Sequence, residues 1–198
     1  DEEYSEFYKK VFHDYNDSLF HIHINADYPL NFKGILYFPK PSHEYQNLDG
    51  EIKLYYNRVF VADNIKEVIP EYLLMLKGVV DCPDLPLNVS RSYLQTNSYV
   101  AKVSAHIVKK VCDKINSLFN TEREKFEGMY EDLKVFLEYA CLKDEKFYDR
   151  IKSSLLFRLV SGGYQTLADC LENNEEKKIY YASDVEQQSV YINMFKNE

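Results

Sequence analysis

The sequence predicts an α/β protein in which a layered α/β domain is followed by a helical connector and then by the start of a smaller α/β subdomain. Short apolar runs predict strands in the first third of the chain. Long stretches with three- and four-residue apolar spacing predict helices in the middle, and one more strand and helix are predicted near the end. The expected boundaries are residues 1–120, 121–160 and 161–198, the last piece being truncated.

The chain is expected to begin with an amphipathic helix and to continue as a sheet. Aromatic and aliphatic side chains recur at helical spacing through residues 3–15. From residue 19 to 25, Phe and Ile alternate with His and Asn, which is typical of a strand with one buried face. The continuous apolar run 35–38 predicts a more buried strand.

A change of side-chain parity marks the next strand. Apolar residues before and after Asn57-Arg58 fall on opposite parities, so a bulge or turn there must redirect the chain. If Val59 and Val61 point toward the core, Phe60 points away from it. Parity alone does not say which face meets water, so a buried Phe60 under a helix layer stays open as an alternative.

Helices are expected to dominate after residue 70. Pro70 suits the first turn of a helix from Glu71 to Leu76, which Lys77-Gly78 would end. A long amphipathic helix is predicted from about Tyr99 to Phe119. Thr121 and Glu124 then form a capping box for the following helix.

The last part of the chain is expected to be a small α/β piece. A helix should follow Lys143-Asp144, and the chain should turn at Gly162-Gly163. A capping box at Thr166–Asp169 predicts a short helix. The run Ile179–Ala182 predicts a strand, and Ser183 is expected to cap a helix that ends near Lys196.

Composition excludes several classes of function. The net charge of −8 and pI near 5.2 argue against a general nucleic-acid surface. Neither a signal peptide nor a membrane-spanning helix is expected within these residues, which have no basic start and no long apolar run, so no membrane partner is expected. His21 and His23 share a strand face without a neighbouring ligand, so solvated histidines are favoured over a metal site. The cysteines form no CxxC pair, which predicts reduced thiols; they are Cys82, Cys112, Cys141 and Cys170.

A proline-punctuated loop provides the main candidate site. Pro83 and Pro86 predict an extended loop, after which Ser90 is expected to cap a short helix through Arg91 and Gln95. An anion there would meet free backbone N–H groups and a planar guanidinium. The competing interpretation is a solvated arginine or a surface ion pair. No glycine-rich nucleotide-binding motif is present, so the chain is not expected to bind nucleotide tightly by itself.

Three segments of the chain resemble a known family. The run YYNRVFVADNIKEVIPEYLLMLKGVVD at residues 55–81, the arginine loop at 76–95 and the helix at 97–115 are similar to the middle segment of the 90-kDa heat-shock protein chaperones, in particular their bacterial high-temperature form. The resemblance covers most of the chain. One departure is Ser92, where the family often has an acidic residue after the arginine, and this puts a local ion pair in doubt.

The resemblance implies roles for individual residues. Arg91 would contact the γ-phosphate of ATP as an arginine finger, and Gln95 would help to hold the phosphate or the attacking water. Asn88, with Ser90, would shape the loop and meet the docking domain. Phe60 lies where the family has an apolar residue implicated in contact with client proteins.

The resemblance also implies partners and cofactors. ATP and Mg²⁺ would be bound mainly by a preceding N-terminal ATPase domain, and a C-terminal dimerisation domain would make the full-length protein a homodimer. Unfolded or partly folded client proteins would be the substrates, the location would be cytoplasmic, and the segment alone would not be an enzyme. Two alternatives stay open: a stand-alone protein-interaction adaptor with no role in ATP turnover, and a small enzyme with an unrecognised site.

Overall fold

A computed structural model gives the structure of the chain and describes residues 2–27, 31–41, 50–63, 69–84, 98–172 and 177–196. The chain divides into two compact units, Asp1–Arg150 and Ile151–Glu198. The first unit contains a five-stranded sheet with helices, and the second contains a two-stranded sheet with short helices. The predicted α/β class is therefore confirmed. The finer division at residues 120 and 160 stays a prediction.

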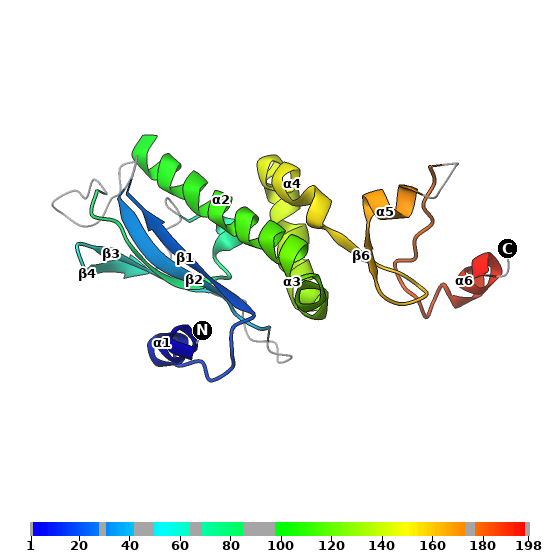
Figure 1. The fold of residues 1–198 in the computed structure, drawn as a ribbon, viewed down its shortest axis with the longest axis horizontal. Coiled ribbons are helices and arrows are strands. Elements are labelled where there is room, and N and C mark those ends of the chain that lie inside the picture. The colour runs from blue at the N-terminus through cyan, green and yellow to red at the C-terminus, as the bar shows by residue number, and fades with distance from the viewer. Residues whose placement is uncertain are drawn as a thin grey trace. The chain divides into compact units, whose positions relative to one another are not determined.

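The five-stranded sheet has the order β1-β2-β5-β3-β4 (Figure 1). All neighbouring strands pair antiparallel except β3 and β5, which run parallel. The last strand of this sheet in chain order, β5, therefore lies between two hairpins formed by earlier strands. The strands are β1 (Phe20–Ala26), β2 (Phe32–Phe38), β3 (Glu51–Tyr56), β4 (Val59–Asp63) and β5 (Lys77–Asp81).

Strand β5 is not predicted from the sequence. In place of the expected helix Glu71–Leu76 the structure has one 3-10 turn, η1 (Glu71–Leu73), with β5 beginning soon after it. Gly78 shows the reason, because a Cβ there would lie 2.5 Å from Cδ2 of Leu36 and 2.7 Å from the carbonyl oxygen of Ile35. The glycine allows β5 to approach β2 closely, and it does not end a helix.

Two long helices, α2 (Ser98–Thr121) and α3 (Arg123–Lys143), pack against one face of the sheet (Figure 1). The ring of Phe38 meets that of Phe136 from α3 edge-on at 5.0 Å. The apolar stripes predicted for both helices are confirmed as core. In α3 the buried residues are Phe126, Met129, Tyr130, Leu133, Phe136, Leu137 and Ala140.

The predicted capping box between these helices is wrong. Helix α2 continues through Thr121, whose hydroxyl donates a 2.8 Å hydrogen bond to the carbonyl of Ser117, and Glu122 precedes α3 without a side-chain cap. Thr121 is the last residue of α2, and the N-cap position of α3 falls on Glu122, so the hydroxyl is not placed to cap the second helix. The helix expected after Asp144 is confirmed as α4 (Glu145–Ile151), with Asp144 accepting hydrogen bonds from the N–H groups of Lys146 and Phe147.

The opposite face of the sheet carries the N-terminal helix α1 (Glu2–Phe12) (Figure 1). Tyr8 and Phe12 of this helix form a buried cluster with Tyr37 of β2. Tyr4 stacks on His21 at 4.0 Å, and its hydroxyl lies 3.1 Å from Nδ1 of the exposed His23. His21 is thus half-buried under α1 and is not the solvated side chain that the sequence predicts.

The second unit contains a small hairpin, β6 (Leu156–Arg158) and β7 (Tyr164–Thr166), beside the 3-10 turn η2 (Lys152–Ser154). Its turn is confirmed at Gly162 and Gly163, whose φ values are 95° and 81°. The capping box is confirmed as well, because Thr166 and Asp169 exchange hydrogen bonds of 3.0 and 3.1 Å at the start of α5 (Leu167–Glu172).

The predicted strand at Ile179–Ala182 is wrong. Residues 177–184 of the structure carry no strand, and Tyr181 is 88% exposed. Among the described residues this run has no neighbouring strand to pair with, and Tyr180 packs on Phe195 with ring centroids 4.6 Å apart. The last helix, α6 (Ser189–Lys196), follows a turn in which Asp184, and not Ser183, accepts the backbone hydrogen bonds.

Candidate functional site

The loop with the main sequence-predicted residues follows β5. Asn88, Ser90, Arg91 and Gln95 all lie within residues 85–97, outside the described part of the chain. Their roles therefore stay predictions. The described residues fix both ends of this segment, which connects the end of β5 to the beginning of α2.

The chain that enters this loop is attached to the sheet on two sides. The N–H of Cys82 donates a 3.0 Å hydrogen bond to the carbonyl oxygen of Tyr55 on β3. On the other side, Oδ2 of Asp84 accepts a 3.1 Å hydrogen bond from the N–H of Asn31, just before β2. Residues 82–84 thus leave the sheet from a fixed position, because they are bound to β3 on one side and to the residue before β2 on the other.

The turn predicted at Asn57-Arg58 is present and joins β3 to β4. Both residues have positive φ, 49° and 65°, as required at the two central positions of a tight hairpin turn. The register of the hairpin also shifts between Leu54 and Tyr55, so a bulge accompanies the turn. Together these features set the direction of the side chains on β4.

Phe60, the predicted client-contact residue, is 46% exposed on β4. Its ring meets the ring of Tyr55 edge-on at 5.7 Å. The expected inward direction of Val59 is wrong, since this side chain is 54% exposed, and the bulge that interrupts the alternation is the reason. The hairpin therefore presents two adjacent apolar side chains to solvent on an edge strand of the sheet.

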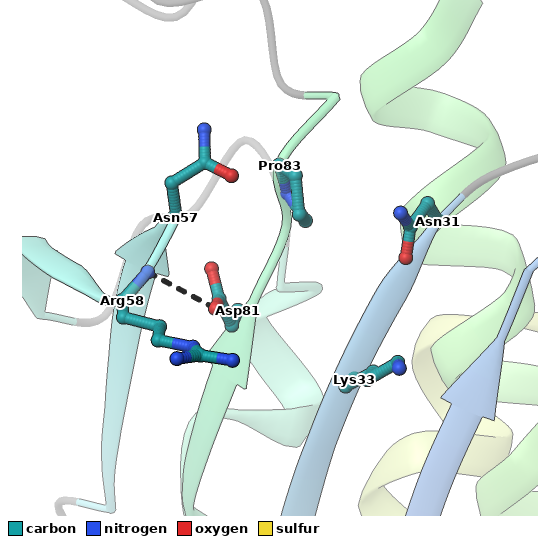
Figure 2. Close-up of a pocket in the computed structure, with 6 residues that line it drawn as sticks. All are labelled: Asn31, Lys33, Asn57, Arg58, Asp81 and Pro83. Carbon is teal, nitrogen blue, oxygen red and sulfur yellow. Dashed lines mark hydrogen bonds between the residues drawn. The ribbon is translucent and has the colours of Figure 1, made fainter.

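A polar pocket lies at the same end of the sheet and has a volume of about 450 Å³ (Figure 2). Three parts of the chain contribute to it: the beginning of β2, the β3–β4 turn and the end of β5. Its lining residues are Asn31, Lys33, Asn57, Arg58, Asp81 and Pro83.

Asp81 is the central charged residue of this pocket. Its Oδ2 accepts a 3.1 Å hydrogen bond from the backbone N–H of Arg58, whereas its buried Oδ1 has no hydrogen-bond partner among the described residues. Lys33 is the residue opposite Asp81 in the β2–β5 register. In the described part of the chain, neither Lys33 nor the Arg58 side chain has an ion-pair partner within 4.0 Å. Two basic residues and one acidic residue thus line the pocket, and the unpartnered Oδ1 of Asp81 is buried away from solvent.

A second polar cluster attaches α1 to the sheet. Oδ2 of Asp14 accepts hydrogen bonds of 2.7 Å from the Tyr8 hydroxyl and from the ammonium of Lys77. Partial burial acts to raise the pKa of Asp14, but the hydrogen bonds from Lys77, Tyr8 and the N–H of Asn16 outweigh it and lower the pKa below its usual value. With its partners mutually satisfied, the cluster is a structural one.

Neither a metal centre nor a membrane span is found in the described ranges. No group of three or more His, Cys, Asp or Glu side chains there could hold a metal ion. No described helix is long and apolar enough to cross a bilayer.

Comparison with known proteins identifies the family. The family model described as Hsp90 protein matches residues 1–197. The chain belongs to the Hsp90 family. This confirms the resemblance found in the three sequence segments.

Individual Hsp90 relatives carry the name chaperone protein HtpG. The protein from Porphyromonas gingivalis is 42% identical over 187 residues, covering 91% of this chain and 27% of the relative. That from Bacteroides fragilis is 41% identical over 206 residues, covering 100% and 30%. The relative from Borreliella burgdorferi is 34% identical over 186 residues, covering 91% and 30%. The chain thus spans less than a third of the length of these relatives.

The polar pocket of this Hsp90 segment is not predicted from the sequence. Lys33, Arg58 and Asp81 lie 25 and 23 positions apart, and only the strand order brings them together. One part of the pocket could be predicted from the sequence, because the change of side-chain parity at Asn57-Arg58 indicated a tight turn there. Predicting the pocket would also have required recognising β5, which positions Asp81.

Proposed function

We propose that this chain is the middle segment of an ATP-dependent molecular chaperone. The family match across residues 1–197 is the observation that carries the proposal. In this role Arg91 contacts the γ-phosphate of ATP bound to another domain of the same chain. Gln95 helps to hold the phosphate or the attacking water, while Asn88 and Ser90 shape the loop and meet the docking domain.

The physical requirement for this role is an arginine delivered from a firmly held support. A guanidinium stabilises the charge that spreads over the transferred phosphoryl group, and its contribution depends on positioning. The hydrogen bonds of Cys82 to β3 and of Asp84 to Asn31, just before β2, support the proposal, because they fix the chain immediately before the segment 85–97. Helix α2 fixes the other end of the segment.

In this proposal, nucleotide binding and dimerisation are carried out by other domains of the full-length protein. ATP and Mg²⁺ are bound mainly by an N-terminal ATPase domain, and a C-terminal domain makes the full-length protein a homodimer in the cytoplasm. The segment alone binds no nucleotide tightly and is not an enzyme. Calorimetry of the 198-residue chain with ATP and Mg²⁺ tests this, and micromolar binding would contradict the two-domain division.

Client proteins are proposed to contact the β3–β4 hairpin. The 46% exposure of Phe60 and the 54% exposure of Val59 support this, because an unfolded chain offers apolar segments that such an edge can bind. Tyr55 packs against Phe60 and gives the exposed ring a firm base.

Replacing Arg91 tests the catalytic part of the proposal. In the full-length protein, Arg91→Ala should lower ATP turnover by up to about 10³-fold, as expected for an arginine finger. Arg91→Lys should recover part of the loss, because the charge is kept and the bidentate geometry is lost. Arg158→Ala, at an exposed arginine of β6, is the matched control and should leave turnover unchanged.

Thermal unfolding of the 198-residue chain with the same substitutions separates catalysis from folding. The unfolding midpoint should be the same for the unmodified chain and for the Arg91→Ala variant. A large drop would show that Arg91 is held in an ion pair within the domain, as the adaptor alternative predicts. Undiminished turnover of the Arg91→Ala protein would remove the phosphate role altogether.

A further inference from the structure

An aromatic contact joins the N-terminal half of α2 to the start of β2. The ring of His106 on α2 meets the ring of Phe32 on β2 edge-on, with the ring centroids 5.1 Å apart. Phe32 is completely buried, and His106 is half-buried. The Nε2 atom of His106 is buried and has no hydrogen-bond partner among the described residues. The proposed function does not use this titratable group.

The start of β2 supports the segment 85–97 from both of its ends. On the N-terminal side, the N–H of Asn31 donates a 3.1 Å hydrogen bond to Oδ2 of Asp84, the last described residue before the segment. On the C-terminal side, Phe32 contacts His106 of α2, the helix that begins directly after the segment. Loosening α2 at this contact therefore weakens the support of the segment at its C-terminal end.

The charged groups that act on the His106 ring come from its own helix. Lys110 and Lys109 oppose a positive charge on the ring, and Asp113 favours one. From β2 the ring meets Phe32, which is uncharged. The buried side chains of β1 and α3, the other elements that contact α2, are uncharged at neutral and mildly acidic pH. A protonated His106 would thus have more like charges than opposite charges around it.

Protonation changes what the buried Nε2 atom requires. A neutral imidazole carries one hydrogen, which can lie on Nδ1 and leave Nε2 as a bare acceptor. Protonation places a hydrogen on both nitrogens, so Nε2 becomes a buried donor that has no acceptor among the described residues. Burial and the charges of Lys110 and Lys109 lower the pKa of His106 below its usual value, against the opposite effect of Asp113. The folded chain therefore favours the neutral ring.

We propose that His106 is an acid-sensitive switch, which holds the N-terminal half of α2 on the start of β2 when it is neutral and loosens this packing when it is protonated. Because the pKa of His106 is lower in the folded chain than in the unfolded chain, the unfolded chain binds the proton more tightly. The stability that the neutral ring contributes is complete above the unfolded pKa of about 6.5, and it is lost as pH falls from there through the folded pKa.

The switch depends only on described residues, whereas its consequence for ATP turnover rests on the proposed function. If Arg91 contacts the γ-phosphate, protonation of His106 weakens the support of the segment that carries this arginine. Ionisation and stability are measured on the 198-residue chain without nucleotide. Failure of the switch and failure of the arginine role are therefore distinguishable.

NMR titration of the His106 ring in the unmodified chain tests the first step. Between about pH 8 and about pH 5, the ring should titrate at a lower pH in the folded chain than in the urea-unfolded chain. The amides of Val103 and Ile107 should lose hydrogen-exchange protection, corrected for intrinsic rates, as the ring becomes protonated. The amide of Leu133 in α3 should keep its protection. A titration midpoint at or above that of the unfolded chain would overturn the proposal.

Urea midpoints at about pH 7.5 and about pH 5.5, where carboxylates stay ionised, test the second step. The unmodified chain should have the lower midpoint at the lower pH. His106→Gln keeps a polar side chain that cannot be protonated, so this variant should lose less stability between the two pH values. His13→Asn is the control, at an exposed histidine whose φ of 50° suits asparagine, and it should keep the full loss. An equal loss in the His106→Gln variant would overturn the proposal.

Discussion

The hydroxyl of Tyr72 donates a 2.6 Å hydrogen bond to Oδ2 of Asp144, 72 positions later in the chain. The other carboxylate oxygen of Asp144 accepts from the N–H groups that begin α4, so one side chain both caps a helix and binds η1. The Tyr72 ring also meets Phe147 of α4 edge-on at 5.7 Å. A polar contact and an aromatic contact thus hold the same pair of elements together.

Tyr72→Phe should remove the hydrogen bond and keep the ring contact. We expect the free energy of unfolding to fall by about 1–2 kcal/mol, because the acceptor is charged and partly buried. Urea unfolding of the chain measures the loss. Tyr15→Phe, at a side chain that is 85% exposed, should change the stability by less than about 0.5 kcal/mol. Equal effects from the two substitutions would show that the Tyr72 bond contributes nothing.

Acid should destabilise the first unit through Asp14 and Asp144. At both, burial acts to raise the pKa, but hydrogen bonds from Lys77 and Tyr8 to Asp14, and from Tyr72 and backbone N–H groups to Asp144, lower it below 3.8. Each carboxylate therefore contributes stability that is complete above the unfolded pKa and is lost as pH falls through the folded one.

Urea midpoints measured from about pH 6 down to about pH 2 test this dependence. The double variant Asp14→Asn with Asp144→Asn should lose less stability across the acid range than the unmodified chain does. The exposed Asp27→Asn provides the control and should keep the full acid dependence. If the urea midpoint of the double variant falls with decreasing pH as steeply as that of the unmodified chain, other carboxyl groups account for the acid sensitivity.

Two glycines should respond in opposite directions to alanine. Gly78→Ala places a Cβ 2.5 Å from the side chain of Leu36, inside the sheet, and should destabilise the chain by several kcal/mol. Gly128 lies within α3 with no atom near the position of a Cβ, so Gly128→Ala should stabilise by about 0.5–1 kcal/mol. Thermal and urea unfolding of the two variants would show the contrast. A tolerated Gly78→Ala would mean that β2 and β5 can separate without loss.

Phe60→Ala should affect binding more than folding. A half-exposed side chain on an edge strand contributes little to the core, so a loss below about 1 kcal/mol is expected. Phe136→Ala, at a side chain that is 3% exposed, should cost about 3–5 kcal/mol. Titration of a destabilised client against the unmodified chain and Phe60→Ala should show weaker association for the variant. Unchanged affinity together with a large stability loss would place Phe60 in the core.

Local patterns predicted the elements whose structure depends on their own residues. The stripes of α2 and α3, the turn at Gly162-Gly163 and the exchange between Thr166 and Asp169 all depend on contacts within a few positions. Strand β5 was missed because Gly78, its second residue, matters only through the neighbouring strand. The strand expected at Ile179–Ala182 has the right composition but no partner among the described residues.

For the candidate sites too, features set by neighbouring residues could be predicted from the sequence, and features set by distant strands could not. Parity left open whether Phe60 is buried or exposed, and the structure shows it 46% exposed; the premise that Val59 points inward is wrong, because the bulge leaves Val59 exposed as well. The polar pocket depends on the register between β2 and β5, and no short-range pattern encodes it. The arginine loop was recognised through its family resemblance, and the roles of its residues stay predictions.

The position of β5 has a consequence for how the first unit folds. Until this strand is inserted, the β1–β2 and β3–β4 hairpins each have an unpaired inner edge, and they are joined only when β5 binds both. The hydrogen bonds of Cys82 and Asp84 require β5 to be in place, so we expect them to form only after the β1–β2 hairpin. We expect refolding followed by pulsed hydrogen exchange to protect the β1–β2 amides before the N–H of Cys82. A partly folded state in which β5 is not yet paired would therefore lack both hydrogen bonds that hold residues 82–84.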